Sequence, residues 1–393
     1  MVAESRRDVP LHLPELPSKS RWANHAGVET RPVLLDHRCR MKIGFVIYGS
    51  LDTLSGGYLY DRKLVEYLRS QGDAVEIISL PWRNYAVHLT DNFYFQLPKN
   101  LDILIQDELN HPSLIFANRG KHPYPIISLV HHLRCSELRP RWQNAFYRVI
   151  EKKYLQSVDG FIFNSKTTQS VVNALMDHGK PAIVAYPPTD RFGEPISERE
   201  IISRAGTNPL RVLFLGNVIE RKGLHTLIEA VKPLKLQVIV DVIGSLDSEP
   251  EYAKQIQKTI RQNNLSAFVF LHGSLDKQPL IEKFKQAHVL ALPSSYEGYG
   301  IVYLEGMCFG LPAVGSTVGA ASEIISDGVN GFLIEPENAD GLASRLKVLD
   351  EKREILIRMS LAARERYLHQ PKWEKTASGI REFLLKQIQE FFV

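Results

Sequence analysis

Cysteines and long apolar runs are scarce in this sequence. Only three cysteines occur in 393 residues, at Cys39, Cys135 and Cys308, and no two of them form a Cys-x-x-Cys pair. Such isolated cysteines exclude a disulfide framework and fit a reducing compartment, so we expect a cytoplasmic protein. No apolar run approaches the ~18 residues that a membrane-spanning helix needs. With 44% hydrophobic and 23% charged residues, the composition is typical of a soluble globular protein.

A strong net charge and a complete dinucleotide fingerprint are also missing. The formal net charge of +4 at pH 7 gives no basis for nucleic-acid binding, although it permits attraction to anionic nucleotides or membrane surfaces. The segment Gly298-Tyr299-Gly300 lacks the third glycine of a dinucleotide-binding fingerprint. No acidic residue follows it at the ribose-binding distance after a second strand. A nucleic-acid-binding protein and a dehydrogenase are therefore both disfavoured.

Residues 1–40 differ from the rest of the chain. They are polar, contain four prolines, and lack the ~7–15-residue apolar core of a signal peptide. Disorder is the expectation for this extension. Because the segment from Met41 to Ile47 is typical of a first strand in an α/β protein, truncation at Met41 is expected to leave folding and activity intact.

From Met41 onward, two series of strand and helix signals follow one another. The first series predicts strands at 42–48, 74–80, 102–106, 125–130 and 160–164, and helices at 58–71, 139–157 and 166–178. The second predicts strands at 211–215, 237–243, 267–271 and 288–292, and helices at 222–234, 250–263, 278–286 and 301–309.

This alternation predicts an α/β protein with two parallel sheets, each covered by helices. The simplest organisation has Rossmann-like domains at 41–186 and 210–370, joined by a linker at 187–209 that is rich in proline and charge. The strand ends of both domains would face a central cleft, which is where ligands bind in open α/β sheets.

Two carboxylates eight residues apart mark the most informative segment. Glu297 falls in the loop after the apolar run 288–293, and Glu305 about one turn into the following helix. The intervening glycines let the backbone approach a ligand closely, and the first helical amides favour anions. Amides for phosphate and carboxylates for hydroxyls together suit a sugar diphosphate. The alternative is two exposed side chains, but Glu305 precedes the mostly apolar run 306–312, where an unpaired charge is costly.

Two further groups of residues follow predicted strands. Gly216 ends the strand 211–215, and Arg221 and Lys222 precede a helix, which suits a diphosphate unless both cations are merely solvated. Gly56 and Gly57 stand between the first strand and the first helix, either as an anion site or as an ordinary turn.

These segments resemble the family-4 retaining glycosyltransferases of the GT-B fold, over roughly residues 41–390. The Glu-x7-Glu pattern of that family matches Glu297-Gly298-Tyr299-Gly300-Ile301, Glu305-Gly306-Met307 and Gly310-Leu311-Pro312-Ala313-Val314. The similarity continues through 319–325 and 327–334. The resemblance implies that a last helix, at 371–393, crosses back to the first domain.

The resemblance also implies an activity and a role for each residue. A hexose would move from a nucleoside diphosphate sugar, most commonly a UDP-sugar, to an acceptor hydroxyl with retention of configuration. Glu305 would bind the ribose hydroxyls and Glu297 the sugar hydroxyls. The remaining donor contacts would come from the backbone of Tyr299, Gly300 and Ile301, from Gly56, Gly57 and Gly216, and from Arg221 and Lys222 as cations on the diphosphate.

His131, after the strand 125–130, falls where this family often has a histidine near the transferred sugar. It would either position a sugar hydroxyl or stabilise positive charge at the anomeric carbon, although an isolated histidine is more often structural. Loops 50–62, 82–98 and 108–122 would select the acceptor, and residues near 271–276 the base. Tyr58 and Tyr60 would shape the acceptor pocket or pack their helix.

No Asp-x-Asp pair occurs in the sequence, unlike in metal-dependent glycosyltransferases, so we expect no metal and no cofactor. The expected partners are the sugar-nucleotide donor and a small-molecule, glycan or lipid acceptor, but no nucleic acid. The basic, partly aromatic stretch 134–153 allows peripheral contact with the cytoplasmic membrane face; alternatively, Phe146, Val149 and Ile150 pack on the sheet. The rival functions are a catalytically silent sugar-nucleotide-binding regulatory protein and a GT-B sugar-nucleotide epimerase.

Overall fold

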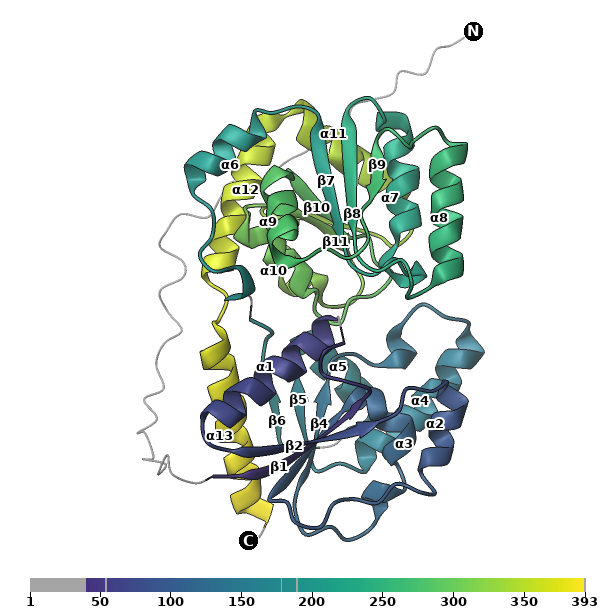
Figure 1. Ribbon diagram of the computed structural model, residues 1–393, viewed down its shortest axis with the longest axis vertical. Helices are drawn as coiled ribbons and strands as arrows, with labels where there is room; N and C mark the ends of the chain where they lie inside the picture. Colours follow the sequence, from purple (N-terminus) through teal and green to yellow (C-terminus); the bar gives the residue numbers. More distant parts are fainter. Residues whose placement is uncertain (1–39, 54, 178, 189, 392–393) are drawn as a thin grey trace, which may run out of the picture. The chain divides into compact units, whose positions relative to one another are not determined.

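The computed structural model describes residues 40–53, 55–177, 179–188 and 190–391. The expected disorder of residues 1–40 lies outside the described residues, except at position 40. Within the described residues, the strands form two six-stranded sheets whose paired strands are all parallel (Figure 1). The expected fold class, two Rossmann-like units of parallel strands and helices, is confirmed.

The first sheet has the strand order β2-β1-β3-β4-β5-β6. Its strands are β1 (Lys42–Tyr48), β2 (Ala74–Leu80), β3 (Ile103–Asp107), β4 (Ile126–Val130), β5 (Gly160–Phe163) and β6 (Ala182–Val184). Its helices are α1 (Gly56–Ser70), α2 (Tyr85–Asp91), α3 (His111–Leu114), α4 (Arg141–Gln156) and α5 (Lys166–Leu175). Strands β3 and β4 are buried along their whole length, as expected for parallel strands covered on both faces.

The second sheet has the order β12-β11-β10-β7-β8-β9. Its strands are β7 (Leu210–Leu215), β8 (Val238–Ile243), β9 (Val269–Leu271), β10 (Val289–Ala291), β11 (Ala313–Ser316) and β12 (Gly331–Ile334). The helices of this part are α6 (Glu198–Ala205), α7 (Leu224–Val231), α8 (Pro250–Gln262), α9 (Lys277–Gln286), α10 (Ile301–Cys308), α11 (Ala339–Glu351) and α12 (Arg353–Leu368).

The order of the strands places the loops of interest side by side. In the second sheet the order reverses between β7 and β10, which are hydrogen-bonded neighbours. The loop after β7 carries Gly216, Arg221 and Lys222, and the loop after β10 carries Glu297. Ligands of open α/β sheets bind at such a switch point, so the topology alone brings these two loops to one place.

The last helix, α13 (Trp373–Phe391), packs with the first sheet although it follows the second in sequence (Figure 1). Its Ala377, Ile380 and Leu384 belong to the same hydrophobic core as residues of β1 and α1. Arg381 also forms two hydrogen bonds of 2.7 and 3.0 Å with the buried carboxylate of Asp73. This buried ion pair fixes the helix in place.

The expected helix 222–234 was wrong at its start. Glu220–Lys222 form a 3-10 turn, Gly223 adopts a left-handed conformation with φ +70°, and α7 begins at Leu224. The left-handed conformation of Gly223 interrupts the helix, and glycine is needed there because a Cβ would lie 2.1 Å from the carbonyl oxygen of Pro293. Several elements were not predicted: helices α2, α3, α11 and α12 and strands β6, β11 and β12. The interval expected to be a linker contains α6.

Helix α4 exposes apolar side chains that the packing alternative placed on the sheet. Trp142 is 72% exposed, Val149 52% and Phe146 47%. That alternative is therefore wrong for Phe146 and Val149. Among the residues that the structure describes, no helix combines the length and the apolarity needed to cross a membrane.

Candidate active site

A cavity of about 890 Å³ lies where the loops after the strands of both sheets meet. Its lining includes every residue that the sequence nominated for the site: Gly56, Gly57, His131, Gly216, Arg221, Lys222, Glu297, Tyr299, Gly300, Ile301 and Glu305. The structure therefore brings the sequence-derived candidates together, although they span some 250 positions of the chain.

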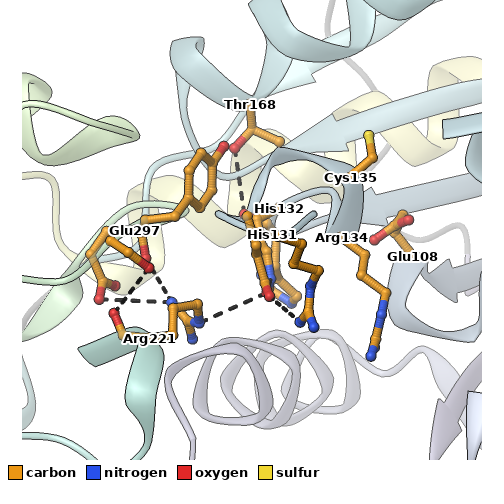
Figure 2. A network of polar contacts seen from close by, with 12 residues as sticks. Glu108, His131, His132, Arg134, Cys135, Thr168, Arg221 and Glu297 are labelled. Carbon is orange, nitrogen blue, oxygen red and sulfur yellow. Dashed lines mark hydrogen bonds and ion pairs between the residues drawn. The ribbon is translucent and has the colours of Figure 1, made fainter. Parts of the chain in front are cut away.

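The loops after β7 and β10 are joined by hydrogen bonds (Figure 2). The amide of Ser295 donates to the carbonyl oxygen of Arg221 at 2.8 Å, and Arg221 Nη1 donates to the carbonyl oxygen of Tyr296 at 2.7 Å. Lys222 Nζ donates to Glu297 Oε1 at 2.6 Å. The two cations and this carboxylate therefore form a single rigid unit at the start of α7.

Glu297 is buried but ionised. Burial alone would raise the pKa of Glu297, but the charges of Lys222 and Arg221 outweigh it and lower that pKa below its usual value. Its Oε1 accepts from Lys222 and from Ser294 Oγ, both at 2.6 Å. Oε2 has no hydrogen bond within the described residues, so it is available to accept one from a ligand hydroxyl.

Glu305 has a partner that the sequence did not reveal. Arg191 Nη1 donates to Glu305 Oε1 at 2.9 Å, and Arg191 comes from a 3-10 turn, Asp190–Phe192, inside the expected linker. Burial raises the pKa of Glu305, and the charge of Arg191 opposes that rise. A ligand hydroxyl is therefore not the sole means of satisfying Glu305, and Arg191 is a cavity residue that the sequence reasoning missed.

The start of α10 leaves backbone amides facing the cavity. Gly300 is its N-cap residue, with φ +88° and no side-chain cap. Gly298 lies close to the loop after β4. A Cβ at this position would come within 2.4 Å of the carbonyl oxygen of His131, so only glycine fits there. The Tyr299 hydroxyl is held by Gln370 Nε2 at 2.8 Å, which leaves the backbone of this segment for a ligand.

His131 is paired with Asp61, a residue that the sequence reasoning did not single out. His131 Nε2 lies 2.9 Å from Asp61 Oδ1, and Asp61 is fully buried in α1. Burial would lower the pKa of His131, but the charge and hydrogen bond of Asp61 outweigh it and raise that pKa to about 9. A protonated histidine cannot stabilise a second positive charge, so the pair favours hydrogen bonding to the sugar over stabilising the anomeric carbon.

The first-sheet wall of the cavity comes from the three loops expected to select the acceptor. Trp82, Tyr85, Glu108 and His111 line it, together with Arg134 from the turn after β4. The packing alternative is supported for Tyr58 and Tyr60, and a role in acceptor binding stays a prediction. Both tyrosines are buried against the core, with hydroxyls that donate to the carbonyls of Tyr48 and Ala185, and both line the cavity.

Two groups of side chains have the composition of metal sites, although the sequence led us to expect no metal. The potential ligand atoms of Asp61, Asp107 and His131 lie within 4.8 Å of one another, as do those of Glu108, His111 and Glu151. In the second group, both ring nitrogens of His111 already have partners, the Tyr85 hydroxyl at 2.8 Å and the Glu108 carbonyl oxygen at 3.0 Å. In the first, His131 Nε2 is bonded to Asp61. Asp61 Oδ2 in the first group and Glu108 Oε1 in the second are buried without a hydrogen-bond partner, so hydrogen bonding accounts for only part of each group.

Comparisons with known proteins agree with this architecture. Residues 197–366 match the family model described as glycosyl transferases group 1. The chain is similar to the D-inositol 3-phosphate glycosyltransferase of Xylanimonas cellulosilytica, with 28% identity over 185 residues, which are 46% of this chain and 43% of that protein. The chain spans less than half the length of the first curated relatives that it matches.

Among solved structures, sucrose-phosphate synthase from Thermosynechococcus elongatus superposes with a TM-score of 0.74 at 18% identity, covering 89% of this chain and all of that one. Anabaena HepE in complex with UDP and glucose superposes with a TM-score of 0.68 at 20% identity, covering 88% of this chain and 99% of that one. At these identities the likeness shows the fold. The chain thus has the GT-B fold, and its residues 197–366 match the model of glycosyl transferases group 1.

Proposed function

We propose that the protein is a retaining glycosyltransferase, which moves a hexose from a nucleoside diphosphate sugar to an acceptor hydroxyl without a metal ion. The observation that carries this proposal is the joined unit of Arg221, Lys222 and Glu297 at a helix start inside the cavity. A UDP-sugar is the first donor to test, because a structural neighbour was solved with UDP and glucose.

Arg221 and Lys222 would stabilise the leaving group. The bond between the anomeric carbon and the diphosphate oxygen breaks, and the acceptor oxygen bonds to the same face of the carbon. The acceptor proton passes to a departing phosphate oxygen. Negative charge grows on the diphosphate during this step, and fixed cations and amides aimed at it lower the barrier. Lys222 keeps two N–H donors for phosphate after bonding Glu297.

The carboxylates and His131 would hold the rest of the donor. Glu297 Oε2 would accept from a hydroxyl of the transferred sugar, and Glu305 from the ribose hydroxyls beside Arg191. His131 Nδ1 has no hydrogen bond within the described residues, so the protonated ring can donate from it to a sugar oxygen. Ser274 and Leu275 line the cavity within the stretch expected to contact the base.

A panel of nucleotide sugars tests the proposal, with thermal shift for binding and release of nucleoside diphosphate for turnover, each with and without EDTA. We expect stabilisation by one donor and release that EDTA does not change. Binding without release across varied acceptors would favour the silent regulatory protein. Conversion of the donor to an isomeric sugar nucleotide would favour the epimerase. EDTA-sensitive release would contradict metal independence.

We further propose that α4 docks on an anionic membrane surface. Trp142, Phe146 and Val149 recur on one face of the helix with large exposed fractions. Exposed basic side chains stand on the same helix, at Arg141, Arg148, Lys152 and Lys153. An apolar stripe flanked by cations suits the boundary between lipid headgroups and acyl chains.

Vesicle co-sedimentation tests this contact. At low salt we expect the protein to bind vesicles that contain phosphatidylserine, and Trp142→Ser to weaken that binding. Leu236→Ser is the matched control, because Leu236 is 81% exposed in the second part of the chain. Absence of binding to anionic vesicles, or an equal effect of both variants, would remove the membrane proposal.

A further inference from the structure

Arg134 is a cation that lines the cavity without an acidic partner. Its guanidinium forms no hydrogen bond or ion pair with any described residue, and its Nε is buried without a partner. Of the other cations in the same cavity, Arg62 donates to the carbonyl oxygen of Leu51 at 2.9 Å, and three more are paired with carboxylates. Arg83 lies 3.0 Å from Asp91, Arg191 2.9 Å from Glu305 and Lys222 2.6 Å from Glu297.

The side chain of Arg134 is nevertheless held in place. Its guanidinium carbon lies 5.1 Å from the ring centre of Tyr85 and 4.8 Å from that of Tyr147. Tyr85 is itself fixed by the 2.8 Å hydrogen bond between its hydroxyl and His111. The centres of these two rings lie 4.9 Å apart, so the guanidinium packs against both rings from one side. This contact holds it while leaving N–H groups free for a planar anion.

The backbone beneath Arg134 is equally constrained. The amides of Arg134 and Cys135 donate to the two carboxylate oxygens of Glu151, at 2.5 and 3.1 Å. Glu151 is fully buried within α4. The turn that carries Arg134 is therefore anchored at two consecutive amides. The guanidinium is thus preorganised for a ligand.

Arg134 lies on the acceptor side of the cavity. Figure 2 shows His131 and His132 between Arg221 on one side and Arg134 with Glu108 on the other. Tyr85 and Glu108, which lie beside Arg134 (Figure 2), follow strands of the first sheet, whereas the cations placed for the donor diphosphate follow a strand of the second. An anion at Arg134 would therefore not belong to the donor.

We infer that the acceptor carries an anionic group, a phosphate or a carboxylate, which Arg134 binds through the free edge of its guanidinium. This inference rests on the proposed function, because it assigns the acceptor of that reaction. An unpaired, partly buried guanidinium is costly to maintain, and a bidentate pair with an oxyanion satisfies it. Trp82, which is 54% exposed, offers an apolar surface for the rest of the acceptor.

Inorganic phosphate is the first probe, measured by phosphorus NMR titration with saturating UDP present so that the donor diphosphate site is filled. We expect the wild type and Arg358→Gln to bind phosphate, and Arg134→Gln to bind it about 10- to 100-fold more weakly, as for a lost charge-assisted hydrogen bond. Arg358 is a suitable control because it is exposed on α12, away from the cavity lining and from α4. Equal binding by Arg134→Gln, or none by the wild type, would overturn the inference.

Two further arms identify the source of the anion. Tighter binding of glucose 6-phosphate than of glucose, lost in Arg134→Gln, would indicate a soluble anionic sugar. Arg134-dependent binding to vesicles of phosphatidic acid would indicate a lipid headgroup. UDP affinity, measured in the same samples, distinguishes failure of the proposed function from failure of this inference. A wild type that does not bind UDP would defeat the proposed function, whereas normal UDP binding without Arg134-dependent anion binding would defeat this inference alone.

Discussion

Individual charges in the cavity depend on partners that are distant in the sequence. Lys222 meets Glu297 across 75 positions, His131 meets Asp61 across 70, and Glu305 meets Arg191 across 114. The sequence located both members of the first pair and one member of each of the other two, because those residues lie near the end of a strand or the start of a helix. It could not locate Asp61 or Arg191, because no local pattern records a contact made by tertiary packing.

The Asp61–His131 pair makes a prediction about pH. The pKa of His131 is raised to about 9, so the protonated form persists at neutral pH and is lost as the pH rises through that value. If protonated His131 binds the sugar, kcat/KM should fall above about pH 9. In Asp61→Asn the charge that raises this pKa is gone while burial still lowers it, so the fall should begin at least about one pH unit lower.

The measurement is the pH profile of kcat/KM for the wild type, Asp61→Asn and a control, Asp52→Asn, which alters an exposed loop. A basic limb at the same pH in all three proteins would show that Asp61 does not set the protonation of His131. Thermal melting at pH 7 checks that Asp61→Asn is folded.

Arg191 makes a second prediction at this scale. Removing it in Arg191→Ala leaves Glu305 buried without a cation, and the pKa of Glu305 then rises further. We expect UDP to bind about 10-fold more weakly, as for loss of one hydrogen bond to a charged group. Calorimetric titration of Arg191→Ala, Arg191→Lys and Glu305→Ala checks this. Unchanged UDP affinity in Arg191→Ala with loss in Glu305→Ala would leave Arg191 outside the site.

At the scale of elements, the two longest strands were predicted with their bounds, and several short elements were not predicted. Strand β1 is an almost wholly buried apolar run, as expected for a parallel strand covered on both faces. Strand β2 stands at the edge of the sheet and has one buried residue, so its bounds were predicted without that signal. Helices α2 and α3 are short and depend on packing against their neighbours, which leaves little local signal. The start of α7 was misplaced because a left-handed glycine, and not a capping side chain, sets it.

Gly223 allows a matched test of that loop. In Gly223→Ala a Cβ would meet the Pro293 carbonyl oxygen at 2.1 Å, in addition to the strain of φ +70°. Gly273→Ala is the control, since it has φ +69° with nothing within 4 Å of the new Cβ. We expect Gly223→Ala to lose more stability than the control, by about 1–3 kcal/mol, and to weaken UDP binding. Equal losses of stability and UDP affinity in both variants would mean that the approach of Gly223 to Pro293 does not position Arg221 and Lys222.

At the scale of the whole molecule, contacts between the two sheets' loops frame the cavity. The carboxylate of Glu323, from the second part of the chain, accepts from the amides of Lys166 and Thr167 at 3.1 and 2.7 Å. These are the first amides of α5, in the first part. Glu323 thus adds, from 156 positions away, to the N-cap Ser165, whose side chain accepts from the amide of Thr168.

Removing the Glu323 contact should loosen α5 locally. In Glu323→Ala we expect the amides of Lys166 and Thr167 to exchange hydrogen about 5-fold faster, which corresponds to about 1 kcal/mol. Hydrogen exchange followed by mass spectrometry measures this, with the peptide that covers α8 as an internal reference. Unchanged exchange at α5 would mean that the contact contributes no stability.

The architecture of the whole chain was accessible from the sequence because alternating strands and helices restrict the topology. The central cleft followed from the rule that strand ends face a common ligand site. The identity of the acceptor could not be predicted from the sequence. The cavity wall proposed for it combines Trp82, Tyr85, Glu108 and Arg134, and none of these residues belongs to a sequence motif.

The most direct test of the account is the rate of nucleoside diphosphate release in Lys222→Ala, measured beside the affinity for the same donor. Because Lys222 is assigned to the charge that develops as the glycosidic bond breaks, turnover should fall by about 10²–10³. Donor affinity should change far less. Wild-type turnover in Lys222→Ala would contradict the leaving-group role, and with it the central claim that this cavity catalyses glycosyl transfer through Arg221 and Lys222.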